Sequence, residues 1–100
     1  MISCDGGRCA LQGPMTMANA TALREEGVRL FTAPEVTVDL AAVTEVDSSA
    51  LSLLFEWRRA ALGAGRRIVF VNLPDNLKSL AALYGVTELL GEARGERREA

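Results

Sequence analysis

Asp47, Ser48 and Ser49 are the residues whose types and spacing could best support chemistry or binding. Asp47 precedes an amphipathic run, so its carboxylate can accept hydrogen bonds from the backbone N–H groups two and three residues on, as an N-cap does. Ser48 then falls at the first helical position, where its hydroxyl points outward and is not used for capping. A phosphate on that hydroxyl would meet the positive end of the helix dipole, which is compatible with a regulated or partner-contacting serine. Ordinary helix capping explains the same residue types, and the residues alone do not decide between the two interpretations.

Other kinds of chemistry find little support. The chain has no histidine, the commonest metal ligand and the commonest general base at neutral pH. We interpret Asp39, Glu45 and Asp47 as solvated acidic loop residues, not as a metal site. Gly63-Ala64-Gly65 follows a helix and lacks the third glycine of a dinucleotide fingerprint, so it predicts a helix stop. We therefore expect no enzymatic activity, no metal and no cofactor.

Composition sets the broad class of protein. One hundred residues, 49% hydrophobic and 24% charged, predict a single folded domain. The net charge of −2 gives no electrostatic argument for binding nucleic acid. No apolar run approaches the roughly 18 residues of a membrane-spanning helix, so we expect no direct membrane insertion. The first residues lack the basic and apolar regions of a signal peptide, which favours a cytoplasmic location.

Cys4 and Cys9 flank a turn at Asp5-Gly6-Gly7-Arg8 and could form a disulfide across a hairpin. Two cysteines are too few for a secreted disulfide scaffold. The C-x4-C spacing also lacks the C-x-x-C geometry that lowers a thiol pKa. We therefore predict two reduced cysteines that serve in packing.

The elements that must position the serines can be predicted from hydrophobic periodicity and from the glycine, proline and capping residues that mark where elements begin and end. The central pair is a strand at Glu35–Leu40 followed, after a short connection, by a helix from Asp47 to about Leu62. The other predicted elements are strands at Ile2–Cys4 and Arg8–Gln12, the second ended by Gly13-Pro14; a helix over about Met17–Phe31 capped by Thr16; a strand at Ile68–Val71; and a helix from Pro74 or Asp75 to Tyr84. Residues 86–90 fit either a helical turn or an edge strand, and we expect residues 91–100 to be a flexible tail after a domain spanning 1–90.

This order, β-β-α-β-α-β-α, predicts an α/β fold with a small mixed β-sheet and helices packed largely on one face. The strands at Val36 and Ile68 are joined by a helical crossover, which implies parallel pairing.

Several segments together resemble the STAS domain family, named for sulfate transporters and anti-sigma factor antagonists. They are VTVDL, the helix start VDSSALSLL, the strand ending in IVFVN and the segment LPDNLKSLAALYGV. The resemblance covers about residues 1–90 and is strongest to the MlaB-like branch, which serves the Mla phospholipid ABC transporter of Gram-negative envelopes. Ala50 stands where the family commonly has glycine, and no clear final strand follows Leu90.

The resemblance implies a non-enzymatic subunit that binds and supports the ABC ATPase of the inner-membrane complex, and so outer-membrane lipid asymmetry. In anti-sigma antagonists the residue that matches Ser48 is phosphorylated; in the Mla branch it is a determinant of ATPase binding. We therefore expect Ser48 at the centre of a docking site, with Asp47 holding the helix start. The supporting candidates are Ser49, Ser52, Phe55, Trp57 and Tyr84.

Two rival functions stay open from the sequence. One is an anti-sigma factor antagonist in a partner-switching pathway regulated by phosphorylation of Ser48. The other is a small nucleotide- or lipid-binding protein that acts alone. Trp57 is more readily explained as a core or rim residue than as a stacking platform, while arginines such as Arg58 and Arg59 could meet an acidic partner. The isolated domain is also a candidate for self-association through an exposed apolar patch.

Overall fold

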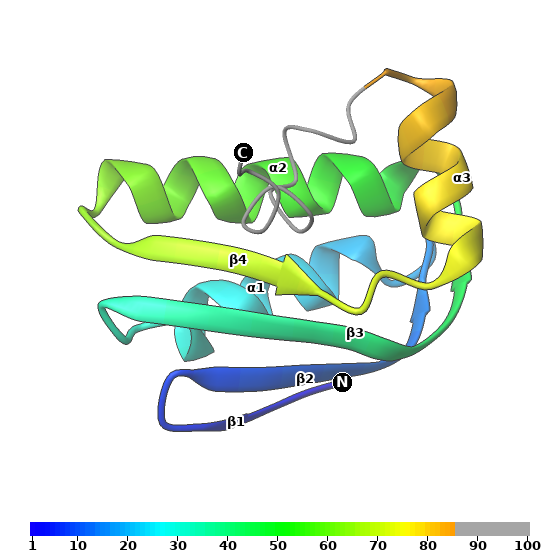
Figure 1. Ribbon diagram of the computed structural model, residues 1–100. Helices are drawn as coiled ribbons and strands as arrows, with labels where there is room; N and C mark the ends of the chain where they lie inside the picture. The colour runs from blue at the N-terminus through cyan, green and yellow to red at the C-terminus, as the bar shows by residue number, and fades with distance from the viewer. Residues whose placement is uncertain (86–100) are drawn as a thin grey trace.

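The chain folds as a mixed α/β domain in the order predicted from the sequence (Figure 1). This computed structural model describes residues 1–85. Its elements are β1 Ile2–Asp5, β2 Arg8–Met15, α1 Ala20–Leu30, β3 Glu35–Val46, α2 Ser48–Gly63, β4 Arg67–Val71 and α3 Asp75–Leu83. The predicted domain boundary at residue 90, the segment 86–90 and the predicted tail lie outside the described residues.

The four strands form one sheet in the order β1-β2-β3-β4, and its mixed character agrees with the prediction. β1 pairs with β2 antiparallel, whereas β2, β3 and β4 run parallel. Parallel strands point their carboxyl ends toward the same edge of a sheet. The ends of β2 and β3 lie together there, with Met15 paired with Val46, while β4 ends earlier, with Val71 paired with Asp39. α2 follows β3 and α3 follows β4, and both therefore begin at this edge (Figure 1).

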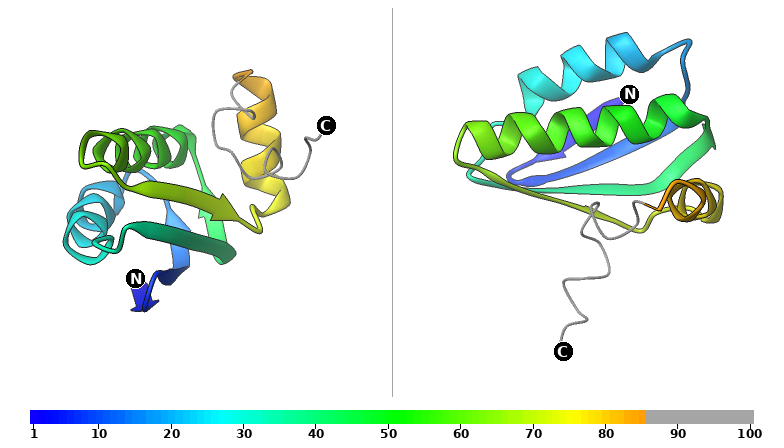
Figure 2. Two further views of the ribbon diagram at one scale, coloured as in Figure 1. Left: turned by 60° about the vertical axis from the view of Figure 1, so that its left-hand side comes forward. Right: turned by 90° about the horizontal axis from the view of Figure 1, so that it is seen from above.

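The helices α1 and α2 lie side by side on one face of the sheet (Figure 2). The alternation of β3 explains this layer, because Val36, Val38 and Leu40 are buried at every second position. α3 stands beyond the carboxyl ends of the strands, next to the start of α2. The expected placement of helices largely on one face is confirmed.

Strands β2 and β3 are longer than the sequence predicts. Gly13-Pro14 does not end β2, which continues to Met15, and β3 extends from Leu40 to Val46. Proline lacks a backbone N–H, but Pro14 lies at a register irregularity between Gly13 and Met15 and beyond the residues that β1 pairs. Proline is tolerated at such bulges, so the two strands stay together for their full length.

The start of α1 also differs from the prediction. Thr16 does not cap it; residues 16–19 form a turn, and the helix begins at Ala20. The side chain of Asn19 holds this turn, since its Oδ1 accepts hydrogen bonds from the Thr16 N–H at 2.9 Å and the Thr16 hydroxyl at 3.3 Å. The connection between β2 and α1 is therefore a structured turn that ends near the carboxyl edge of the sheet.

The end of α2 agrees with the predicted stop at Gly63-Ala64-Gly65. Gly65 has φ +74°, the left-handed conformation that glycine adopts without strain. The N–H groups of Gly65 and Arg66 donate to the carbonyls of Leu62 at 3.2 Å and Ala61 at 2.8 Å, the pattern of a Schellman cap.

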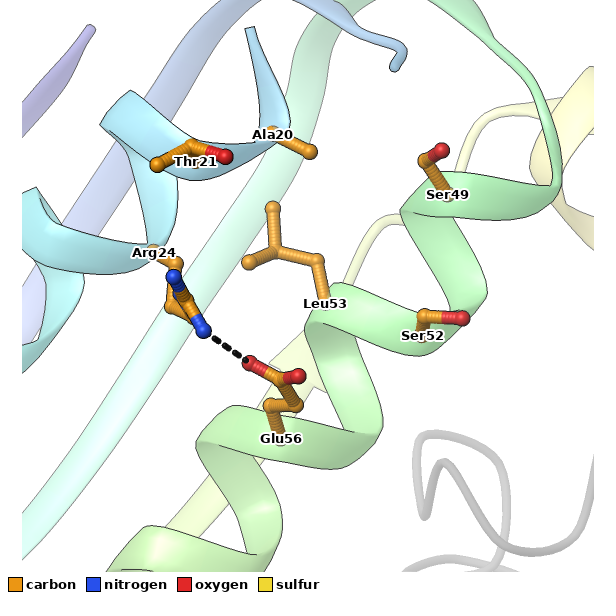
Figure 3. A pocket seen from close by; sticks show the side chains of 7 residues that line it. All are labelled: Ala20, Thr21, Arg24, Ser49, Ser52, Leu53 and Glu56. Carbon is orange, nitrogen blue, oxygen red and sulfur yellow. Dashed lines mark ion pairs between the residues drawn. The ribbon is translucent and has the colours of Figure 1, made fainter.

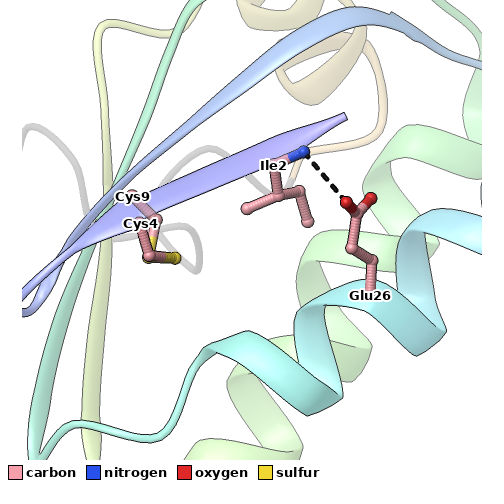
Figure 4. Close-up of a disulfide and its surroundings, with 4 residues drawn as sticks. All are labelled: Ile2, Cys4, Cys9 and Glu26. Atoms are coloured by element: carbon pink, nitrogen blue, oxygen red, sulfur yellow. Dashed lines mark hydrogen bonds between the residues drawn. A yellow bond between two sulfur atoms is a disulfide. The ribbon is translucent and has the colours of Figure 1, made fainter.

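The prediction that the cysteines are reduced is wrong, because Cys4 and Cys9 form a disulfide, although Cys9 does pack in the core (Figure 4). The turn between β1 and β2 pairs Cys4 directly with Cys9, with Cα atoms 4.0 Å apart. That separation is near the shorter of the two spacings in an antiparallel ladder, where facing side chains come closest. The C-x4-C spacing does not reveal this disulfide, because the bridge depends on the hairpin register that places the two side chains opposite one another.

Candidate functional site

Asp47 connects the start of α2 to a distant part of the chain. Its Oδ1 accepts a hydrogen bond from the Ser49 N–H at 2.8 Å, as predicted for an N-cap. Its Oδ2 accepts one from the Met17 N–H at 3.0 Å, in the turn before α1. These bonds, the Met17 bond foremost, hold the pKa of the Asp47 carboxyl below its usual range. The carboxylate therefore fixes both where α2 begins and where the turn before α1 lies.

Ser48 occupies the first position of α2 and is exposed. Within residues 1–85 its hydroxyl has no hydrogen-bond partner, because capping is done by the Asp47 carboxylate. The hydroxyl is thus held on an ordered helix end and faces outward, as the sequence predicted.

An exposed stripe runs along α2 from Ser48. Residues at spacings of three and four lie on one side of a helix, which groups Ser48, Ser52, Phe55, Arg59 and Leu62. We call these five residues the α2 stripe. Phe55 is half-buried, whereas the Leu62 side chain is 63% exposed. Phe55, Leu62 and two arginines line a shallow pocket of about 340 Å³ on this side of the helix.

A second hollow, the α1–α2 groove, lies between the two helices (Figure 3). It holds about 220 Å³, and its walls are Ala20, Thr21 and Arg24 of α1 with Ser49, Ser52, Leu53 and Glu56 of α2. An exposed ion pair between Arg24 Nη1 and Glu56 Oε1 at 3.6 Å bridges the helices at one end. Ser52 belongs to both surfaces, so the groove and the α2 stripe are continuous.

Two of the predicted supporting residues lie elsewhere. Trp57 is 2% exposed and packs edge-on against Phe31, with ring centroids 5.0 Å apart. Its indole N–H donates to the Arg24 carbonyl at 3.5 Å, so Trp57 supports the α1–α2 contact from inside and presents no surface to a partner. Tyr84 is 56% exposed and directly follows the last residue of α3, so it is not part of the α2 stripe.

The acidic residues do not form a cluster of loop carboxylates. Asp39 and Glu45 lie on β3, and within residues 1–85 no three acidic or cysteine side chains gather in a metal-binding arrangement. Asp39 accepts hydrogen bonds from the Ala41 N–H at 2.9 Å and from Asn72, and it pairs with Arg8 at 3.2 Å. These partners, the Ala41 N–H first, lower the pKa of Asp39. The Asp39 carboxylate of β3 therefore has a structural role, since it links β3 to Arg8 of β2 and to Asn72 after β4.

Three features of the site do not follow from the predictions made from the sequence. The Met17 N–H donates a hydrogen bond to Asp47 across 30 residues, and no local sequence pattern predicts this contact. The α1 wall of the groove depends on how the helices pack, which the sequence does not state. The continuation of the stripe to Arg59 and Leu62 could have been found, because spacings of three and four from Ser48 lead directly to both.

The comparisons with known proteins place this geometry in a family. A family model described as "Mlab, STAS domain" matches residues 4–91. The chain belongs to the STAS domain family. STAS domains are generally regulatory rather than catalytic.

Solved structures similar to this STAS domain confirm the fold. The anti-sigma factor antagonist SpoIIAA in its unphosphorylated form superposes with a TM-score of 0.62 at 11% identity, covering 83% of this chain and 81% of that one. The STAS domain of a SulP transporter from Vibrio cholerae gives 0.60 at 19% identity, covering 82% and 65%. SLC26A9 gives 0.70 at 16% identity over 81% of this chain, which spans only 16% of that protein. None of the curated proteins compared with the chain matches it.

A STAS domain can stand alone, as in an antagonist, or belong to a transporter, so the relatives leave its partner open. Among residues 1–85, none of the three helices has the length and hydropathy required to cross a bilayer.

Proposed function

We propose that this STAS domain is a non-enzymatic cytoplasmic subunit that binds and supports the ATPase of a Mla-type phospholipid ABC transporter. It would lie at the inner membrane through that complex and serve outer-membrane lipid asymmetry. The description of the matching family model names Mlab, which supports the MlaB-like branch of the STAS family over its other branches.

The observation that carries the proposal is the state of Ser48. An exposed hydroxyl that has no hydrogen-bond partner among residues 1–85, on a helix end fixed by two hydrogen bonds to Asp47, is available and preorganised for a partner. A preorganised group loses little conformational entropy on binding, so it favours docking without rearrangement.

The chemistry of the α2 stripe indicates what the ATPase surface must offer. Hydroxyls at Ser48 and Ser52 call for hydrogen-bonding groups, Phe55 and Leu62 for an apolar patch, and Arg59 for a carboxylate at the rim. Interfaces commonly combine an aromatic anchor with a polar rim in this way.

The test is a pull-down of the tagged protein from its native cells, with recovered partners identified by mass spectrometry. We expect the wild-type chain to recover an ABC ATPase and Ser48→Lys to lose it, because a lysine at the helix N-terminus adds bulk and an unfavourable charge. Ser3→Lys is the matched control, since Ser3 is exposed on β1 and far from the α2 stripe.

Circular dichroism of both variants establishes that they are folded. An ATPase retained by folded Ser48→Lys would move the docking site away from Ser48. Recovery of a kinase-like anti-sigma factor, with no ATPase, would overturn the transporter proposal.

The second candidate is a phosphorylation-regulated anti-sigma factor antagonist. It is favoured by the same exposed Ser48 hydroxyl and by the structural similarity to SpoIIAA. This function predicts that Ser48→Glu changes the affinity for an anti-sigma factor, whereas a transporter subunit would show no such partner.

A further inference from the structure

The β1–β2 hairpin holds two sulfur atoms in different environments. Cys9 is 1% exposed and sits on β2, which is paired on both sides, with Cys4 of β1 and Val38 of β3. Cys4 is exposed and lies on β1, the outer strand of the four. A reagent arriving from solvent can therefore reach the Cys4 side of the disulfide more readily than the Cys9 side.

The hairpin has other interactions that hold β1 in place. The Gln12 N–H donates to the Met1 carbonyl at 2.9 Å, and the Met1 amino group donates back to the Gln12 carbonyl at 3.2 Å. The buried Ile2 side chain joins the core, and its N–H donates to Glu26 of α1 at 3.3 Å (Figure 4). β1 thus stays bound to β2 and α1 without the sulfur bridge, so opening the bridge leaves both thiols positioned to close it again.

We infer that the Cys4–Cys9 pair is a reversible thiol–disulfide exchange site, with Cys4 as the sulfur that is attacked and modified. The chemical class of co-reactant is a low-molecular-weight thiol and its disulfide, of which glutathione is the example. Exposed disulfides are the labile ones among protein disulfides, and the burial difference selects the sulfur.

In the reducing direction, a glutathione thiolate attacks Cys4 Sγ, the Cys4–Cys9 bond breaks, and Cys9 leaves as a thiolate that takes a proton from water. A second glutathione thiolate then attacks the glutathione sulfur of the mixed disulfide. Cys4 leaves as a thiolate that is protonated in turn, and glutathione disulfide is the other product. Two glutathione molecules are oxidised and one protein disulfide is reduced; glutathione disulfide drives the reverse reaction.

The exchange site lies at the opposite end of the sheet from Ser48. In the parallel register of β2 with β3, Arg8 next to Cys9 pairs with Thr37, whereas Met15 pairs with Val46 beside the start of α2. The exchange can therefore be tested without a partner protein, and its outcome is independent of the proposed docking function.

The experiment equilibrates the full chain in buffers of reduced and oxidised glutathione, quenches with acid, labels free thiols with a maleimide and determines masses. We expect the two thiols to appear and disappear together and reversibly, with unchanged circular dichroism. Peptide mapping of the trapped mixed disulfide should place glutathione on Cys4.

Single-cysteine variants test the selectivity. With glutathione disulfide, Cys9→Ser should gain one glutathionyl group on Cys4. Cys4→Ser should react at Cys9 at least about tenfold more slowly, since a buried thiol reacts only after local opening. Glutathione mapped to Cys9 in the wild-type chain, a pair that stays oxidised in excess reduced glutathione, or loss of the fold on reduction would overturn the inference.

Discussion

Asp47 and Ser48 are neighbours with different roles at the start of α2. The Asp47 carboxylate accepts the Ser49 N–H of its own helix and the Met17 N–H of the turn before α1. Because Asp47 does the capping, the Ser48 hydroxyl is left exposed. A substitution at Asp47 should therefore act mainly on stability, and one at Ser48 mainly on binding.

The first prediction concerns the pH dependence of stability at Asp47. Its folded-state pKa is lowered, chiefly by the Met17 N–H, so its contribution to stability is present above the unfolded pKa and is lost as pH falls through the folded value. Asp47→Asn keeps one acceptor but has no charge at any pH. Urea unfolding should find the variant less stable than the wild type near neutral pH. The difference between their free energies of unfolding should narrow below about pH 4, which is close to the pKa of an unfolded aspartate. A difference that is constant across this range would contradict the role of the carboxylate charge.

At the level of elements, the contact between α1 and α2 depends on a small residue facing a large one. Gly27 of α1 lies against the Trp57 indole, and a Cβ added at Gly27 would collide with the ring. The two helices can therefore come this close only because position 27 has no side chain, which the helical pattern of α1 does not reveal.

Gly27→Ala should accordingly destabilise the fold by about 1–3 kcal/mol, the usual cost of overpacking a core. Gly63→Ala is the matched control, since a Cβ there meets open space and the change should be neutral or slightly stabilising. Urea unfolding followed by circular dichroism measures both variants. If Gly27→Ala were as stable as the wild type, the two helices would have to move apart at little energetic cost, which would contradict the prediction.

Local signals predicted α2 and α3 well, and long-range pairing explains what they missed. Asp47 and Gly65 mark the ends of α2 through caps that are visible in the sequence. No comparable sequence signal predicts the extension of β3 to Val46. Several of its residues after Leu40 are exposed, and they belong to the sheet only because they pair with β2.

The same distinction applies to the candidate site. Ser48, Ser52 and Phe55 could be predicted because helical spacing groups them on one side of α2. The sequence favours a core or rim position for Trp57, but its full burial could not be predicted, because it depends on Gly27 of the neighbouring helix and on Phe31 at the end of that helix.

At the scale of the whole molecule, the disulfide closes a short loop at the edge of the sheet. It spans a separation of 5 residues and leaves the parallel strands untouched. In the chain-entropy account, a loop of this size contributes roughly 2 kcal/mol to the free energy of unfolding.

Reduction should therefore lower the free energy of unfolding by about 2 kcal/mol, without changing the fold. Urea unfolding with and without a strong reductant measures the difference, and the Cys4→Ala/Cys9→Ala double variant should show no further response to reductant. A reduced chain that is unfolded without urea would mean that the bridge, and not the core, holds the domain together.

The position of Trp57 has an optical consequence. It is the chain's single tryptophan, and it lies 9 residues after Ser48, about two and a half helical turns, so it faces the opposite side of α2 from the stripe. Its fluorescence therefore arises from within the α1–α2 contact, next to the Phe31 ring. Separation of the helices should shift the emission to longer wavelength, while a partner bound on the stripe should leave it nearly unchanged. The domain thus contains an intrinsic probe that distinguishes loss of structure from occupancy of its surface.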